Sequence, residues 1–290
     1  MSDKTSLFQT GQDRYRPDPN HQINNDQDYR LNQRRLARWI GAMAICLPFV
    51  LLASTIWVGC MRDSVSHFYF TPFFGDVFVG VMFFIGTFLI AYRGDNKSEN
   101  WFATLAGIGA FGTALFPINH DGCRKTEFAS RVFARTNDIS AAPNEAPYNY
   151  ALTPLRDGAM ENFFILIGAA PILHSVFALM LTGFLAYYCF RVFTRVDPET
   201  QLNPDGSLTA VKQRRNRFYR IAGWMIVFAI VSMTTHVILK NVLGIPTGIP
   251  GWDNARGSFI AEAVAMVAFG ISWVIKGRIF SGLDDRLDAD

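Results

Sequence analysis

Long apolar runs alternate with polar stretches along the chain after residue 38. Six of these runs are long enough to cross a bilayer as helices, which takes about 20 residues each. The expected spans lie between Arg38 and Arg62 and over about 74–92, 101–118, 162–190, 219–241 and 258–275. This pattern predicts an all-α polytopic membrane protein, with a bundle of six transmembrane helices in one membrane domain over residues 39–277.

Two of the expected spans have distinctive residues. The run over 101–118 is rich in Gly and Ala, which let neighbouring backbones approach closely, so we expect its helix at the centre of the bundle. The run over 162–190 is longer than one span needs and contains Pro171. His174 follows this proline, and its depth has two readings. It lies near the bilayer middle if the helix begins at Asn162, and near the surface if the helix is measured back from Arg191.

Polar segments flank and connect the spans. Residues 1–38 are rich in Asn, Gln, Asp and Arg and have no apolar core, which excludes a cleavable signal peptide and predicts a disordered tail. The other polar segments are the loops over 119–161 and 191–218 and the tail over 278–290. An Asn-Pro-Asp-Gly sequence in the loop over 191–218 predicts a turn.

The distribution of Lys and Arg predicts the orientation of the chain. Of the 27 Lys and Arg residues, 19 fall on the face that holds both tails and the loop over 191–218. Basic residues mark the cytoplasmic side, so both termini are predicted to be cytoplasmic and the loop over 119–161 to be outside. The basic cluster over 212–217 is most simply a topology anchor, and binding to anionic lipid headgroups is the alternative.

Composition agrees with a membrane protein. The chain is 50% hydrophobic and only 18% charged, whereas soluble domains have about 25% charged residues. The net charge of +3 is small and the basic residues lie at the ends of apolar runs, so no nucleic-acid partner is expected. The lipid bilayer is the expected partner, with other membrane subunits as further candidates. Trp273 and Lys276, at the end of the last span, are expected to anchor it at the membrane interface.

The polar stretch from Ser64 to Asp76 lies between the first two spans. It contains hydroxyls, a histidine and a carboxylate among five aromatic rings. We interpret it as a re-entry point at the membrane surface, where polar groups lead into the top of the helix bundle, and its rings as an interfacial belt.

Other ionisable residues fall at a similar depth in the outer half of the bundle. They are His174, His236 and Glu262 within spans, and His120 with Asp121 after the third span. Ionisable groups at membrane depth usually face the bundle interior or a water-filled cavity. The sequence therefore predicts a polar cavity that opens outward.

Three histidines and two carboxylates in such a cavity would suit a divalent metal such as zinc. The predicted ligands are His67, His174 and His236, which would leave one position for water. Zinc lowers the pKa of bound water to roughly 7 and so generates a hydroxide nucleophile.

Four further residues complete this hypothetical catalytic site. Asp76 or Glu262 would act as general base, and Ser64 or Ser66 would support the oxyanion. The alternative is structural, because no His-x-x-x-His places two ligands on one helix face. In that reading each polar group satisfies a neighbour. Glu262 would pair with Lys240 or Arg256, and His174 would bond into the gap that Pro171 leaves in its helix.

Four cysteines occur and none forms a Cys-x-x-Cys motif. Cys60 and Cys123 fall on the predicted outer side, a compartment that allows disulfides. A bond between them is predicted, and two unrelated small residues are the alternative.

Several motifs carry a resemblance to a known family. The stretches 64–71, 75–80, 91–94, 114–117 and 272–277 resemble bacterial multi-pass membrane proteins of a domain-of-unknown-function family. The likeness covers about residues 57–277. It implies a bacterial inner-membrane location and supplies no activity.

A more distant resemblance is to membrane hydrolases of the alkaline ceramidase type. Ser64, His67 and Asp76 are similar to a Ser, His and Asp set in that family. The spacing here is shorter, and the seventh helix and the late His-x-x-x-His are absent.

Three functions are consistent with these patterns. The first is a structural or accessory subunit of a membrane complex. The second is a zinc-dependent hydrolase of a lipid amide or ester. The third is a pathway for protons or a small solute.

Overall fold

The computed structural model describes residues 19–59, 61–71, 73–93, 97–118, 134–136, 163–165, 169–196, 201–280 and 283. Six long helices make up most of this part: α2 (Pro19–Val58), α3 (Phe74–Ala91), α4 (Lys97–Leu115), α5 (Ala170–Tyr187), α7 (Ala210–Asn241) and α8 (Gly257–Lys276). The 3-10 helix η2 (Ser66–Phe70) precedes α3, and the π-helix η4 (Tyr188–Val192) continues α5. Strands β1 (Ala134–Thr136) and β2 (Phe163–Ile165) form one short antiparallel pair, with Ala134 opposite Ile165. The predicted all-α class is confirmed.

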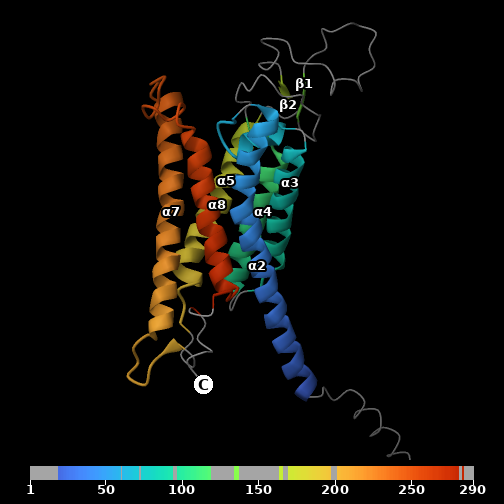
Figure 1. Ribbon diagram of the computed structural model, residues 1–290, viewed down its shortest axis with the longest axis vertical. Helices are drawn as coiled ribbons and strands as arrows, with labels where there is room; N and C mark the ends of the chain where they lie inside the picture. The colour runs from blue at the N-terminus through green and yellow to red at the C-terminus, as the bar shows by residue number, and fades with distance from the viewer. Residues whose placement is uncertain are drawn as a thin grey trace, which may run out of the picture.

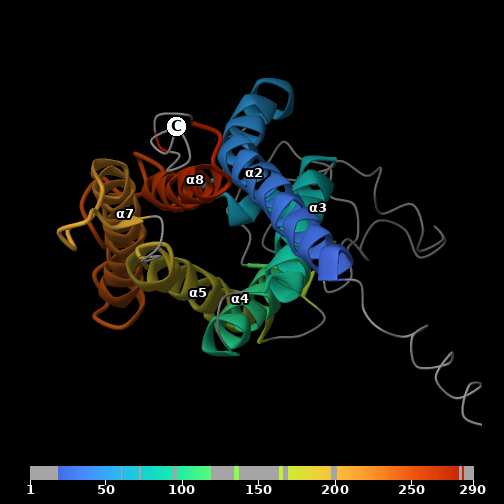
Figure 2. The ribbon, with the colours of Figure 1, turned by 90° about the horizontal axis from the view of Figure 1, so that it is seen from below.

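The six long helices form a closed ring in chain order (Figure 2). Each packs against the next, and α8 returns to pack against α2. The α2–α3 and α5–α7 contacts are the least extensive in the ring. The helices run along a common axis in alternating directions, so α2 begins and α8 ends at the same end (Figure 1). We call this end the Arg38 end, and the opposite end, which carries Ser64–Thr71, the Ser66 end.

Five segments are long and apolar enough to cross a membrane. They are Gln33–Trp57 within α2, Phe74–Ala91, Ala170–Val192, Ala210–Asn241 and Gly257–Lys276. Helix α4 has a comparable length of 19 residues, but Lys97 and Glu99 in its first turn and its many small residues make it less apolar. The chain is therefore a multi-pass membrane protein by the composition of its helices.

Three helices begin at places that differ from the predicted boundaries. Helix α2 begins at Pro19 and includes residues 19–38 of the tail expected to be disordered. This stretch has no Gly or Pro after Pro19, and extending an existing helix is far easier than nucleating one. Helix α7 begins at Ala210, where the Thr209 hydroxyl accepts a hydrogen bond from the Lys212 amide, so part of the expected loop is helical.

The start of α5 corrects the reading of Pro171. The helix begins at Ala170 and not at Asn162. Pro171 therefore lies in the first turn, where its missing N–H removes no helical hydrogen bond, and not inside the helix. His174 consequently lies one turn into α5 at the Ser66 end, which is the second of the two predicted depths.

The turn predicted between α5 and α7 is present. The amide of Gly206 donates to the carbonyl of Asn203, and Gly206 has a positive φ of 77°. Asp205 accepts a hydrogen bond from the Ser207 amide, and these contacts with Ser207 lower the pKa of the Asp205 carboxyl below its ordinary value. The turn is thus fixed by local hydrogen bonds at the Arg38 end.

Small residues on α4 allow close helix contacts, as predicted. A Cβ on Gly107 would lie 2.7 Å from the Gly86 carbonyl oxygen of α3, and one on Gly109 would lie 2.9 Å from the Phe177 carbonyl oxygen of α5. The predicted central position of this helix is wrong. Helix α4 uses its small residues on two sides, because it is a member of the ring between α3 and α5.

Aromatic side chains fill the ring near the Arg38 end. Trp273 is fully buried, with its ring centroid 5.0 Å from that of Phe88 and 5.3 Å from those of Tyr92 and Phe193. Its expected role as an interfacial anchor is therefore wrong, since it points into the bundle and packs in the core. Edge-to-face contacts of this kind stabilise aromatic clusters beyond their buried area.

Polar groups close the Arg38 end around these rings. Arg38 donates from Nε to the Gly277 carbonyl at 2.7 Å, at the end of α8. Glu99 pairs with Arg195, and the Tyr188 hydroxyl donates to the Glu99 carbonyl at 2.7 Å. Basic groups here satisfy carbonyls at helix C-termini, which have no partner within the helix.

The contact between α2 and α8 yields a test of ring closure. We expect Gly270→Ala to lower the unfolding temperature of the detergent-solubilised protein, because the added Cβ would lie 2.6 Å from the Gly41 carbonyl oxygen. Overpacking of this kind costs about 1–3 kcal/mol. Gly183→Ala is the matched control, since nothing lies within 4 Å of its Cβ position. Equal unfolding temperatures for the two variants, measured by differential scanning fluorimetry, would contradict the close contact.

Candidate functional site

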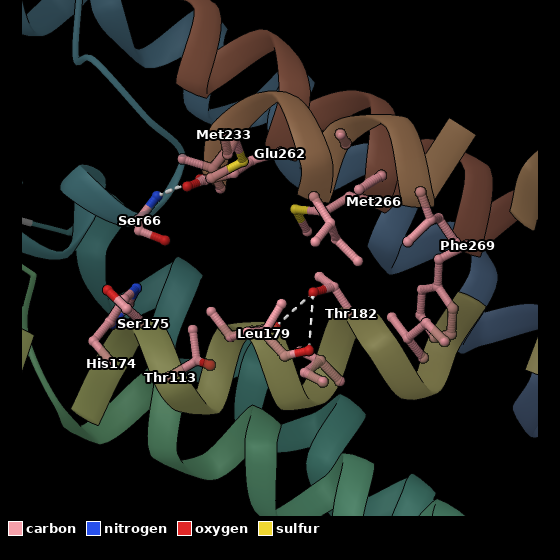
Figure 3. Close-up of a pocket in the computed structure, with 18 of the residues that line it drawn as sticks. Ser66, Thr113, His174, Ser175, Leu179, Thr182, Met233, Glu262, Met266 and Phe269 are labelled. Carbon is pink, nitrogen blue, oxygen red and sulfur yellow. Dashed lines mark hydrogen bonds between the residues drawn. The ribbon is translucent and has the colours of Figure 1, made fainter. Parts of the chain in front are cut away.

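A cavity of about 300 Å³ lies inside the ring, between the Ser66 end and the aromatic cluster (Figure 3). Helices α5, α7 and α8 supply most of its walls, with smaller contributions from α2, α3, α4 and the segment around Ser66. Most of the lining side chains are apolar. The polar side chains in the lining are Ser66, Thr113, His174, Ser175, Thr182, Thr234 and Glu262.

Glu262 and Ser66 form the polar contact on one side of the cavity. The Ser66 amide donates to Oε2 of Glu262 at 3.0 Å, across 196 positions of sequence. Glu262 lies in the second turn of α8, and η2 brings Ser66 to it at the Ser66 end of the ring. Figure 3 shows this pair facing His174, Ser175 and Thr113 across the cavity. The cavity therefore contains a carboxyl group together with hydrogen-bond donors and hydroxyl groups.

His174 is buried and fixed to the neighbouring helix. Its Nδ1 lies 2.7 Å from the Phe116 carbonyl oxygen, just after the end of α4. A carbonyl oxygen can only accept, so Nδ1 carries the proton in this contact. His174 thus satisfies a carbonyl at the α4 C-terminus, and it does not bond into the helix ladder near Pro171.

The deeper part of the cavity is mainly apolar. Met266 and Phe269 of α8 line it beyond Glu262, and the hydroxyl of Thr182, opposite Met266, is bonded to the Ala178 carbonyl. Methionine is flexible and polarisable, and such side chains adapt to ligands of different shapes. The polar cavity predicted from the sequence is therefore polar at its Ser66 end and mainly apolar over the rest of its length.

The cavity reaches the outer surface of the ring between α5 and α7. Leu179 of α5 and Val237 of α7 both line it, and they are 52% and 51% exposed. This seam is one of the two with the least extensive helix contacts. The opening therefore faces sideways, where the apolar surface of the helices would meet lipid.

The three predicted metal ligands do not meet. Among the described residues, no three His, Cys, Asp or Glu side chains gather where they could hold one ion. His67 Nδ1 lies 2.6 Å from the Ser64 hydroxyl, and His236 Nε2 lies 3.3 Å from Asp253. Only His174 lines the cavity. The predicted zinc ligand set is not assembled, because each histidine belongs to a different element and has partners of its own.

The remaining predicted site residues divide in the same way. Ser66 and Glu262 line the cavity, whereas Ser64 is buried against His67 outside the lining. Asp76 is exposed in the first turn of α3 and does not line the cavity. Of the predicted site residues, Ser66, His174 and Glu262 thus line one cavity, whereas Ser64 and Asp76 do not. The catalytic roles of these residues stay predictions.

Glu262 has none of the basic partners that the structural alternative assigned to it. Lys240 pairs with Asp253 at 2.9 Å, and Arg256 pairs with Asp63. In the described part of the chain, no Lys, Arg or His pairs with Glu262. Its carboxyl group therefore faces the cavity and accepts a hydrogen bond from the Ser66 amide.

The stretch from Ser64 to Asp76 enters the bundle, as predicted, but its rings do not form a belt. Phe68, Tyr69 and Phe70 in η2 are at most 2% exposed, and only Phe73 is largely exposed. The Phe68 ring centroid lies 6.1 Å from that of Phe259 in α8. These rings pack η2 into the ring of helices and so hold Ser66 against Glu262.

Sequence reasoning missed several lining residues. Ser175, Leu179 and Thr182 recur at the spacing of one helix face on α5, and Met233 and Val237 do so on α7. This periodicity is the signal that could have identified them. Within an apolar span, however, the lipid-facing and cavity-facing sides are both apolar, so the pattern alone does not distinguish them.

Other predicted features lie outside the described residues. They are the Cys60–Cys123 disulfide, His120 and Asp121. The two cysteines that the structure describes, Cys46 and Cys189, are free.

Comparison of the chain with protein-family models, curated proteins and solved structures finds no match in any of the three. The two resemblances noted from the sequence therefore stay predictions. The interpretation of the site depends on its geometry.

The contact between Ser66 and Glu262 makes a stability prediction. We expect Glu262→Leu to unfold at a lower temperature than Glu262→Gln, because Leu leaves the Ser66 amide without its acceptor, whereas Gln retains one. A buried donor without a partner costs about 1–3 kcal/mol. Both variants remove the same charge, so the comparison isolates the hydrogen bond. Identical unfolding curves in scanning fluorimetry would show that the bond contributes nothing.

Proposed function

We propose that the chain is a six-span membrane protein in which α4 is the sixth span. Helix α4 has 19 residues and packs between α3 and α5, both of which are apolar enough to cross a membrane. If α4 did not cross the membrane, the spans α3 and α5 would have no helix between them within the bilayer. Gly and Ala lower its hydropathy and at the same time allow the close packing that favours helix association in lipid.

Both termini are proposed to be cytoplasmic. Helices α2 and α8 reach the Arg38 end, which also carries Arg195, Lys212 and Arg217. Cytoplasmic segments carry an excess of Lys and Arg. The Ser66 end and its cavity opening would then belong to the outer half of the membrane.

The proposed role is the binding of a single-chain amphiphile from the lipid phase. The observation that carries this proposal is a lateral, mainly apolar cavity with a carboxyl group, Glu262, at one end, which pairs with no basic residue of the described chain. Ionisable groups within membrane spans are costly and rare, and they mark functional sites by default. A volume of about 300 Å³ is at the lower limit of ligand pockets, which favours one hydrocarbon chain over a lipid with two.

The chemistry of the polar end indicates the type of headgroup. The Glu262 carboxyl group accepts hydrogen bonds, and the hydroxyls of Ser66 and Thr113 both donate and accept. A ligand whose polar end carries an amine, amide or hydroxyl would satisfy Glu262. Its hydrocarbon chain would extend toward Met266 and Phe269.

This proposal bears differently on each of the three functions expected from the sequence. The accessory-subunit role and the proton or solute pathway stay predictions. The zinc-dependent hydrolase has no support from the described ligands, because His67 and His236 lie outside the cavity lining. Binding is favoured because it requires only the cavity and its polar end.

A labelling experiment tests the topology. We expect cysteines introduced at Ser207 and Thr247, both exposed in loops at opposite ends, to react with a membrane-impermeant maleimide from opposite sides of the membrane. The four native cysteines are replaced first. Ser207→Cys should react only after the cells are opened, and Thr247→Cys in intact cells. Reaction of both from the same side would contradict six spans.

A binding experiment tests the ligand site. We expect Glu262→Gln to weaken binding of dodecylamine about tenfold, since hydrogen bonds to charged groups contribute about 1.5–3 kcal/mol. Ala178→Leu should also weaken dodecylamine binding, because the larger side chain would occupy part of the apolar cavity. Native mass spectrometry of protein released from nanodiscs gives the bound fraction.

Asp76→Asn is the matched control, because Asp76 is exposed and outside the cavity. Equal affinities for Asp76→Asn, Glu262→Gln and the unmodified protein would disprove a role for the cavity carboxyl group.

A further inference from the structure

Among the basic residues over 212–220 on α7, two pairs have different surroundings. Lys212 and Arg215 are buried, at 3% and 5% exposure. The Lys212 ammonium donates to the carbonyls of Phe193 and Arg195 after η4, and Arg215 donates to the Leu283 carbonyl at 3.3 Å. These two residues therefore hold the Arg38 end together and are not available to a ligand.

Arg217 and Arg220 form the second set and face a groove at the Arg38 end. The groove has a volume of about 370 Å³, and its lining includes Gln213, Asn216, Arg217, Arg220, Ile221 and Trp224. Both arginines are exposed. Neither has a hydrogen bond or ion pair with the residues that the structure describes. Two guanidinium groups one helical turn apart thus converge on a space that has no acidic side chain among its described lining residues.

Asn216 adds an unsatisfied polar atom to this groove. It is only 7% exposed, and its Oδ1 accepts no hydrogen bond within the described chain. A buried polar atom without a partner is costly and calls for an explanation. A ligand that presents both an anion and a hydroxyl would satisfy the guanidinium groups and Oδ1 together.

An apolar strip continues from the groove along the same face of α7. Ile221, Trp224 and Phe228 follow Arg217 at helical spacing and are 50%, 66% and 73% exposed. The Trp224 ring is held by Phe190 of η4, with centroids 5.4 Å apart at 74°. A tryptophan directly beyond basic residues is typical of the level of lipid headgroups.

The geometry points to a binding site for one anionic phospholipid on the outer face of α7. The phosphate lies between Arg217 and Arg220, where planar guanidinium groups match phosphate oxygens. The acyl chain lies along Ile221, Trp224 and Phe228. The strip favours a lipid over free phosphate, because a soluble anion would use only the arginines. This site requires that the chain span a membrane, but it is independent of the ligand proposed for the cavity.

The test compares two double variants of equal charge. Arg217→Gln with Arg220→Gln removes the groove arginines, and Arg35→Gln with Arg93→Gln removes two exposed arginines elsewhere at the Arg38 end. The probes are phosphatidylglycerol, phosphatidylcholine and inorganic phosphate, with bound lipid measured by native mass spectrometry of the full chain. A basic residue near an anionic membrane surface contributes about 1 kcal/mol, so the groove variant should bind phosphatidylglycerol about thirtyfold more weakly. Circular dichroism verifies that both variants are folded.

Each outcome decides the proposal. The proposal is supported if the unmodified protein and the Arg35/Arg93 variant bind phosphatidylglycerol in preference to phosphatidylcholine and the Arg217/Arg220 variant loses this preference. Equal loss in both variants overturns it in favour of general charge attraction. Binding of inorganic phosphate to the unmodified protein as strong as that of phosphatidylglycerol overturns the assignment to a lipid.

Discussion

Close backbone contact between the first and the last long helix makes the rest of the structure possible. Gly41 and Gly270 lie where a Cβ on either would come within 2.6 Å of the carbonyl oxygen of the other. This contact joins α8 to α2 and turns six successive helices into a ring with an interior. At the Arg38 end that interior is filled by Trp273 and its aromatic neighbours. At the other end, η2 packs into the ring and the Ser66 amide bonds to Glu262, and the cavity lies between this pair and the aromatic cluster.

The sequence predicted the helices well because lipid imposes strict requirements on them. A span needs a long apolar run whose backbone bonds are satisfied within the helix, so the runs near 74–92 and 258–275 matched α3 and α8 closely. The positions at which helices end in water are less strictly determined by the sequence. Pro19 and Ala210 as helix starts depend on the extension of helices already formed within the bundle. The ring order could not be read from the sequence, since it depends on which small residues face which neighbour.

The candidate site was predicted in part for a similar reason. Glu262, His174 and Ser66 were identified because polar groups at membrane depth need partners. Their grouping with His67 and His236 was wrong because depth specifies height along the axis but not direction around it. His236 stacks on Trp252 and contacts Asp253 in the loop after α7, so it points away from the cavity. The apolar wall was missed because side chains that face lipid and side chains that face a cavity have the same composition.

The unequal contacts around the ring divide it into two groups of three helices. Helices α3, α4 and α5 pack extensively on one another, as do α7, α8 and α2, whereas the α2–α3 and α5–α7 seams between the groups are less extensive. The cavity has walls from both groups. If the two groups of helices move relative to each other, the cavity and its opening change shape. The extensive contacts within each group are kept. The two groups then open or close the cavity between them. Glu262 belongs to the group of α7, α8 and α2, and His174 to the group of α3, α4 and α5.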